Sequence, residues 1–146
     1  MENNIAAATL KPKEERRLLR GHLWAYRNEF KQLPEIEDGA LVDVFSSERR
    51  FAGRGFYQAA GGIAVRLLIR HQNPIDAAFL EARIAAAKQL RDVLFPGSRV
   101  YRWVFGESDG LPGLVADRYD ELVCVQSSCA FYQQWRDTLA ALFLAA

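Results

Sequence analysis

The sequence has few residues that could build a metal site or a disulfide scaffold. It contains two cysteines, Cys124 and Cys129, and two histidines, His22 and His71, in 146 residues. Two cysteines cannot form a disulfide framework, and these four residues do not have the spacing of a zinc site. We therefore expect no metal centre.

Long apolar runs and a secretory leader are also missing. No apolar run approaches the roughly 18 residues needed to span a membrane. The N-terminus, MENNIAAATLK, lacks a basic stretch followed by an apolar core of about 7 to 15 residues. The composition, 50% hydrophobic and 25% charged, is that of an ordinary globular protein. These features predict a cytoplasmic protein and exclude a membrane protein.

Charge is unevenly distributed. The net charge is +1, but residues 1–72 hold 12 Lys and Arg against 9 Asp and Glu, whereas residues 73–146 hold 7 against 9. The segment from Lys11 to Arg20 carries five cations and two glutamates. A surface for RNA phosphates is therefore expected in the basic first half.

The first half is predicted to be mostly β-structure. Residues 1–8 lack a periodic apolar pattern and are expected to fray. Pro12 fits the first turn of a short helix over 11–21, which Gly21 would end by adopting a positive φ. Strands are predicted at 23–26, 40–45, 51–58 and 63–69. Short, closely spaced strands with one helix near the front favour a small barrel, because closure hides sheet edges.

The second half begins with a helical pattern. Asn73 is a candidate cap, and Pro74 suits the first position of a helix over 74–94. Three strands are predicted at 100–105, 114–117 and 122–126, with a final helix from about Ala130. We therefore expect an α+β chain with two domains, 1–72 and 73–146.

The second domain is expected to be incomplete. After Asp137 no charged residue, cap or glycine stop is present. The alternative is a natural C-terminal helix packed into its own domain, since a buried helix need not show a polar face.

Residues 53–56, Gly-Arg-Gly-Phe, begin like a dinucleotide-binding fingerprint. The third glycine is absent, and the glycines lie inside a strand. The favoured interpretation is that they allow a bulge or a close backbone approach while Arg54 projects outward. An exposed Arg54 could also contact RNA phosphate.

Other chemically active side chains have ordinary explanations. Glu107 and Asp109 resemble an acid–base pair, but they lie among turn residues, so a turn role is favoured. Cys124 lies in an apolar strand and is expected to be a small buried hydrophobe, and neither it nor Cys129 has a partner in sequence that would activate the thiol. No glycine-rich loop links a strand to a helix. We therefore expect no catalytic residue and no cofactor site in this chain.

Histidine and aromatic residues in the first half have two interpretations. His22 could contact RNA or bond a helix end. The rings of Trp24, Tyr26, Phe56 and Tyr57 could stack on bases, although a core role is favoured for aromatics in short strands.

Several blocks resemble one family. They are LKPKEERRLLRGHLWAYRNEF (10–30), GALVDVF (39–45), RFAGRGFY (50–57), IAVRLL (63–68) and YRWVFGESDGLPGLVADRY (101–119). Together they are similar to the bacterial class I S-adenosylmethionine-dependent methyltransferases that modify cytosine C5 in large-subunit ribosomal RNA. Leu23 and the turn at 58–62 depart from the usual family pattern.

The resemblance implies a PUA-like RNA-binding barrel followed by the start of a small α/β domain of the strand-strand-helix type. The family's Rossmann-like catalytic domain, with its cofactor loop and catalytic cysteine, would follow Ala146, so neither cysteine here inherits that role. S-adenosylmethionine is implied for the full-length family and structured ribosomal RNA as the partner. The alternative is a stand-alone PUA-type module that binds RNA or protein without catalysis, and dimerisation is left open. Expected RNA-binding residues are Lys11, Arg16, Arg17, Arg20, His22 and Arg54.

Overall fold

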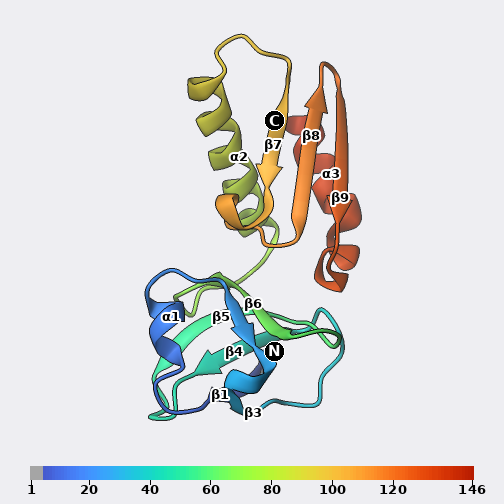
Figure 1. Ribbon diagram of the computed structural model, residues 1–146. Coiled ribbons are helices and arrows are strands. Elements are labelled where there is room, and N and C mark those ends of the chain that lie inside the picture. Colours follow the sequence, from blue (N-terminus) through green and yellow to red (C-terminus); the bar gives the residue numbers. More distant parts are fainter. Residues whose placement is uncertain (1–4) are drawn as a thin grey trace. The chain divides into compact units, whose positions relative to one another are not determined.

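A computed structural model describes residues 5–146 and divides the chain into two compact units, with the division between Asn73 and Pro74. We call them the first unit and the second unit, and Figure 1 shows the elements of each. The sequence predicts this change of pattern between residues 72 and 73. Within residues 5–146, no helix is both long and apolar enough to cross a membrane.

The first unit is built on a curled six-stranded sheet (Figure 1). Its elements are β1 (Ala6–Leu10), α1 (Glu15–Leu19), β2 (Trp24–Tyr26), the 3-10 helix η1 (Arg27–Glu29), β3 (Phe30–Gln32), β4 (Leu41–Phe45), β5 (Phe51–Tyr57) and β6 (Ile63–Ile69). The strand order is β2-β6-β5-β4-β1-β3, in which β1 runs parallel to β4 and antiparallel to β3. The predicted α+β class is confirmed, and the sheet forms a half-barrel whose two end strands are β2 and β3.

Small and branched side chains fill the inside of this sheet. Val42, Val44 and Val65 are fully buried, and α1 adds Leu18, which is also fully buried. Because each of these side chains leaves water completely, each contributes on the order of 1.5–3 kcal/mol to folding. The curl of the sheet thus encloses one apolar core.

The expectation that residues 1–8 fray is wrong where the structure describes them. Strand β1 inserts between β4 and β3, and its Ala8 and Leu10 are fully buried. Alanine has low β-propensity, so an alanine-rich segment gives little strand signal. Its small side chains nevertheless fit an interior position in the sheet. Residues 1–4 lie outside the described part of the chain.

Helix α1 is shorter than the segment predicted at 11–21. Gly21 follows it with φ of 110°, and the His22 N–H bonds the Arg17 carbonyl at 3.1 Å. The prediction that Gly21 ends the helix with a positive φ is therefore confirmed. The turn brings the chain directly into β2.

Gly53 and Gly55 permit a close approach of two backbones. A Cβ at Gly55 would lie 2.0 Å from the Arg66 carbonyl oxygen, and one at Gly53 would lie 3.0 Å from the Ile69 carbonyl oxygen. The register of β5 against β6 shifts between Arg54 and Gly55. The glycines thus act in strand packing, as the favoured interpretation of the sequence predicted.

The second unit is a three-stranded sheet with helices on one face. Its elements are α2 (Ala77–Leu94), β7 (Val100–Phe105), the 3-10 helix η2 (Gly106–Asp109), β8 (Leu114–Tyr119), β9 (Leu122–Ser127), the 3-10 helix η3 (Ala130–Trp135) and α3 (Arg136–Ala145). The strand order is β7-β8-β9. Trp103 of β7 donates to the Ile84 carbonyl of α2 at 3.1 Å and packs edge-on against Phe143 of α3 at 5.0 Å. Both helices therefore cover the same face of the sheet.

Two sequence expectations change in this unit. Helix α2 is capped by Asp76, whose carboxylate accepts the Phe79 N–H at 3.0 Å, so Asn73 and Pro74 precede the helix instead of starting it. Cys124 is exposed, because it lies on the terminal strand β9 of the sheet, whereas Cys129 is buried. The prediction that Cys124 is buried is wrong.

Candidate nucleic-acid interface

Helix α1 and its C-cap residue carry two cations that make no side-chain bond within the described part of the chain. Arg16 and Arg20 are exposed, and neither guanidinium makes a hydrogen bond or an ion pair with any residue in 5–146. Such side chains can bind phosphate without first losing a protein partner.

Arg17 lies on the same helix but is partly used in the fold. Its guanidinium bonds Glu29 at 2.6 Å and lies over the Tyr26 ring at 5.1 Å. The other oxygen of Glu29 accepts the Tyr26 N–H at 2.8 Å. The Arg17 side chain remains 43% exposed, so it can stabilise η1 and still face an anion.

Lys11 and Arg70 fix the two ends of the segment 11–22, which contains α1. Lys11 bonds η1, and Arg70, the residue after β6, bonds the far end of the segment. Lys11 is exposed and donates its ammonium to the Asn28 carbonyl at 2.7 Å. Arg70, at the end of β6, donates to the carbonyls of Leu18 and His22 at 3.0–3.1 Å. Arg70 thereby ties the end of α1 to the end of β6, in addition to the bond that the Leu18 carbonyl accepts from the Gly21 N–H at 3.1 Å. No local sequence signal identifies it, because its partners lie about 50 positions earlier in the chain.

His22 and Trp24 lie beside these cations. The backbone N–H of Trp24 donates to Nδ1 of His22 at 3.3 Å, and the two rings meet edge-on at 5.9 Å. Arg66, directly opposite Trp24 in the β2–β6 register, lies over the indole at 5.5 Å from its centroid. His22 and Trp24 thus belong to one cluster with a cation of β6.

The predicted aromatic set divides into two groups. Phe56 is 1% exposed, so the core interpretation is confirmed for it. Trp24, Tyr26 and Tyr57 are partly exposed, and each carries an arginine over its ring. A ring that keeps contact with a guanidinium lies at the surface of the unit, where the interpretation as a stacking residue stays open.

Arg54 does not project outward as expected. Its guanidinium bonds both oxygens of Asp43, at 2.6 and 3.0 Å, and donates to the Asn73 carbonyl at 2.7 Å. The two side chains are only 11% and 10% exposed. The hydrogen bond and charge of Asp43 raise the pKa of Arg54 against the opposing effect of burial. The predicted hairpin strands contained a signal for this ion pair, because an acidic and a basic residue, Asp43 and Arg54, lie directly opposite each other in the β4–β5 register.

Asp109 has the structural role that its turn position indicated. Its carboxylate bonds the buried Arg91 at 2.6 and 2.8 Å and accepts the Phe105 N–H at 2.6 Å. A carboxylate bound in this way is not free for acid–base chemistry. Within residues 5–146, no group of three or more histidine, cysteine or acidic side chains could hold a metal ion.

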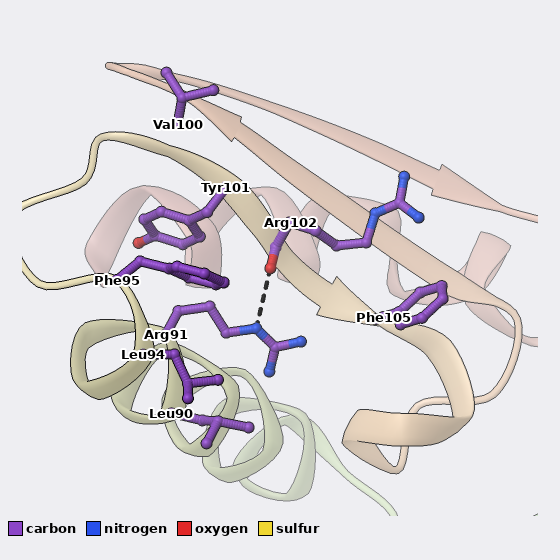
Figure 2. A pocket seen from close by; sticks show the side chains of 8 residues that line it. All are labelled: Leu90, Arg91, Leu94, Phe95, Val100, Tyr101, Arg102 and Phe105. Carbon is purple, nitrogen blue, oxygen red and sulfur yellow. Dashed lines mark hydrogen bonds between the residues drawn. The ribbon is translucent and has the colours of Figure 1, made fainter.

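The second unit has an apolar groove of about 350 Å³ between α2 and β7 (Figure 2). Figure 2 shows Leu90, Leu94 and Phe95 on one side, with the Arg91 Nε donating to the Arg102 carbonyl at 3.0 Å.

The groove does not fit S-adenosylmethionine. Within residues 5–146, its lining holds no carboxylate to take a ribose hydroxyl or the cofactor's ammonium, and its two arginines, Arg91 and Arg102, are ion-paired to Asp109 and Asp117. Among the described residues, the glycine at a strand-to-helix junction is Gly106, which is buried and opens the four-residue 3-10 helix η2, so no glycine-rich loop there offers a helix N-terminus to an anionic group.

Comparison with known proteins identifies the first unit. A family model described as PUA-like domain matches residues 8–70. Ribosomal RNA large subunit methyltransferase I of Alteromonas mediterranea is 34% identical over 138 residues, covering 92% of this chain and 35% of that protein. The protein of the same name from Shewanella denitrificans is 36% identical over 135 residues, covering 89% of this chain and 34% of its own length. The chain therefore spans about a third of the length of these relatives.

Solved structures share the fold. "A putative sam-dependent methyltransferase from Streptococcus mutans" superposes with a TM-score of 0.83 at 18% identity, covering 95% of this chain and 37% of that one. A second methyltransferase structure, complexed with SAH, matches with the same score and coverage. The first unit is a PUA-like domain. The chain as a whole is similar to a stretch that makes up about a third of the length of each ribosomal RNA large subunit methyltransferase I named above.

Proposed function

We propose that this chain is the RNA-holding portion of an S-adenosylmethionine-dependent methyltransferase that modifies cytosine C5 in large-subunit ribosomal RNA in the cytoplasm. The similarity to the named relatives over about nine-tenths of the chain supports this proposal. S-adenosylmethionine supplies the methyl group in such a reaction. It and the covalent cysteine chemistry would be the work of a catalytic domain outside these 146 residues.

The observation that carries the RNA-binding part is a pair of exposed guanidiniums in a PUA-like domain, Arg16 in α1 and Arg20 at its C-cap, neither of which bonds a residue in 5–146. The two lie four positions apart, and the Arg20 N–H bonds the Arg16 carbonyl at 3.2 Å, so both side chains lie near the same end of the helix. Arg17 and Lys11 extend this surface with cations that are already oriented by Glu29 and Asn28. Contacts of this kind hold the RNA backbone without reading its sequence.

The remaining predicted residues have different parts in this proposal. His22 lies at the end of the cationic surface, next to Trp24. Arg54 is bound to Asp43 between adjacent strands, so its role is to hold β4 and β5 together.

The test is the salt dependence of RNA binding by the full chain, with a fragment of large-subunit ribosomal RNA as ligand. Replacing both Arg16 and Arg20 with alanine removes two phosphate contacts. The slope of log K against log salt is then expected to become shallower by about 1.4 to 1.8, because each contact contributes about 0.7 to 0.9.

A charge-matched control is the double variant Arg50→Ala, Arg136→Ala. Both side chains are exposed and lie outside α1, one in the β4–β5 turn and one at the start of α3. The control is expected to leave the slope nearly unchanged. If both double variants change it equally, binding is a general charge effect and α1 is not the interface.

A further inference from the structure

Trp24 lies at one end of the first unit's sheet. Strand β2, which carries it, pairs with β6 on one side only. The indole is partly exposed, whereas its neighbour Ala25 is fully buried. This difference shows that Trp24 is directed away from the core, so part of the residue is accessible at the surface.

Arg66 forms a second layer on this ring. Its guanidinium carbon is 5.5 Å from the indole centroid, and its Nε donates to the Gln58 side-chain oxygen at 2.9 Å. Gln58 thus restrains the planar guanidinium over the indole. Aromatic faces and guanidinium planes are the two surfaces on which proteins stack unpaired nucleobases.

His22 completes the cluster. Because its Nδ1 accepts the backbone N–H of Trp24, Nε2 is the ring nitrogen that would donate to a base carbonyl or a phosphate. Arg20 is four residues from Trp24, so their Cα atoms are at most about 14 Å apart. The cluster and the unengaged cations of α1 therefore lie within reach of neighbouring nucleotides.

We propose that this stacking cluster, Trp24 with Arg66 and His22, receives one unpaired RNA base while the α1 cations hold the flanking phosphates. The RNA class is accordingly a strand with a bulged or looped nucleotide, in contrast to a continuous duplex, whose bases are stacked on each other and offer no free face. The inference rests on the proposed RNA-binding function and names the kind of RNA that the same surface takes.

The other two arginine–aromatic pairs are tied into the fold. Arg17, over Tyr26, is ion-paired to Glu29. Arg27, over Tyr57, bonds that ring's hydroxyl and three carbonyls of the turn at 58–61. These pairs stabilise η1 and the β5–β6 turn, and Tyr57 also packs against the core. Trp24 differs from them in having the His22 ring edge-on beside it, two residues after Arg20.

The experiment uses the full chain and three synthetic RNA hairpins: one with a single unpaired adenosine in the stem, one with an abasic residue at that position, and one fully paired. Trp24→Leu keeps an apolar side chain but removes the aromatic face. It is expected to weaken binding of the bulged hairpin by about 5- to 150-fold. Binding of the abasic and paired hairpins should change little, and the salt slope should stay the same because the indole carries no charge.

Trp24→Phe is the conservative control, since it keeps an aromatic face and should retain most of the preference for the bulged hairpin. Thermal unfolding of each variant checks that the first unit is folded. Should Trp24→Leu fail to fold, wild-type protein and Trp24→Phe still test the proposal through their preference for the bulged over the abasic hairpin.

Quenching of tryptophan emission by the bulged hairpin gives a second readout. Trp103 and Trp135 emit in both proteins, whereas Trp24 emits only in the wild type. Quenching is therefore expected in the wild type and should be reduced in Trp24→Phe.

Equal affinity of the wild type for the bulged and abasic hairpins overturns the stacking proposal. So does an equal loss on all three hairpins in folded Trp24→Leu. After either of these outcomes, the proposed function stands as long as the protein still binds RNA and the Arg16→Ala, Arg20→Ala double variant flattens the salt slope of that binding. If no hairpin and no ribosomal RNA fragment binds at low salt, both proposals fail.

Discussion

The two units differ in what they leave at the surface. Among the described residues of the first unit, Leu19 is the single exposed large apolar side chain. The second unit exposes many: Leu90, Val93, Leu94, Phe95, Val100, Phe105, Tyr119, Leu122, Val125 and Leu144. A curled sheet encloses its own apolar face. In the second unit the exposed apolar side chains lie on all three strands, at the C-terminal end of α2 and in α3. The surface of the first unit is therefore mainly polar, and the proposed RNA interface lies on it, whereas the second unit has the kind of surface that proteins use in contacts with other proteins.

Each unit contains a nearly buried arginine–aspartate ion pair, but the two pairs join different kinds of elements. In the first unit, Arg54 and Asp43 join adjacent strands of one sheet. In the second, Arg91 and Asp109 join a helix to the turn after β7. Each pair can therefore be broken separately, which makes the division into two units testable.

The largest expected effect comes from Gly55→Ala. Its new Cβ would lie 2.0 Å from the Arg66 carbonyl oxygen, which is backbone and cannot turn aside. The cost is expected to exceed the roughly 3 kcal/mol typical of severe overpacking, so the first unit should unfold. Two-dimensional amide NMR should show loss of dispersed signals from the first unit only. If the second unit unfolds with it, the two are one cooperative body.

Gly97→Ala is the matched control. Gly97 has φ of 75°, but its Cβ would meet no atom within 4 Å. A cost of about 1–2 kcal/mol is expected from backbone strain alone.

Asp109→Ala tests the second unit. It leaves the Arg91 guanidinium buried without its carboxylate, and the expected loss is about 3–5 kcal/mol in the free energy of unfolding. Denaturant titration followed by NMR should show the second unit unfolding earlier while the first keeps its midpoint. Ser108→Ala, at the exposed neighbouring position, should change stability by no more than about 0.5 kcal/mol. An equally small effect for Asp109→Ala would show that the pair does not support the unit.

The smallest effect concerns an exposed pair in the same unit. A hydrogen bond from Arg102, at 2.8 Å, and its charge lower the pKa of Asp117 against a smaller opposing effect of burial. Because the folded pKa lies below the unfolded value near 3.9, this contribution to stability is present above about pH 4 and is lost as pH falls through the folded pKa.

Asp117→Asn should therefore be slightly less stable than the wild type at pH 7, with a difference that shrinks toward zero in strong acid. Urea midpoints measured across pH test this. A difference that does not depend on pH would mean that the Asp117 charge is not its cause.

Much of the fold was accessible from sequence because its signals are local. Branched residues at 63–69 and the glycine at 21 have strand and turn preferences that need no partner. Strand β1 was missed because alanine carries no such preference, and Cys124 because an apolar strand can still be terminal in its sheet. The interface was predicted in part: the cations of α1 are visible as a run, but the position of Arg66 over Trp24 depends on which strands pair. Arg70 and Arg91 were missed for the same reason, since their partners are set by tertiary structure.

Strand β1 has a consequence for how the first unit forms. It is near the start of the chain, yet it occupies an interior position in the sheet, and Ala6 pairs with Val42 while Thr9 pairs with Gln32. During synthesis β1 leaves the ribosome before β3 and β4, so its pairing with β4 must wait until that later strand has emerged. Contacts so distant in sequence slow folding. The early segment is rich in alanine and poor in large apolar side chains, which keeps it from associating with other chains during that wait.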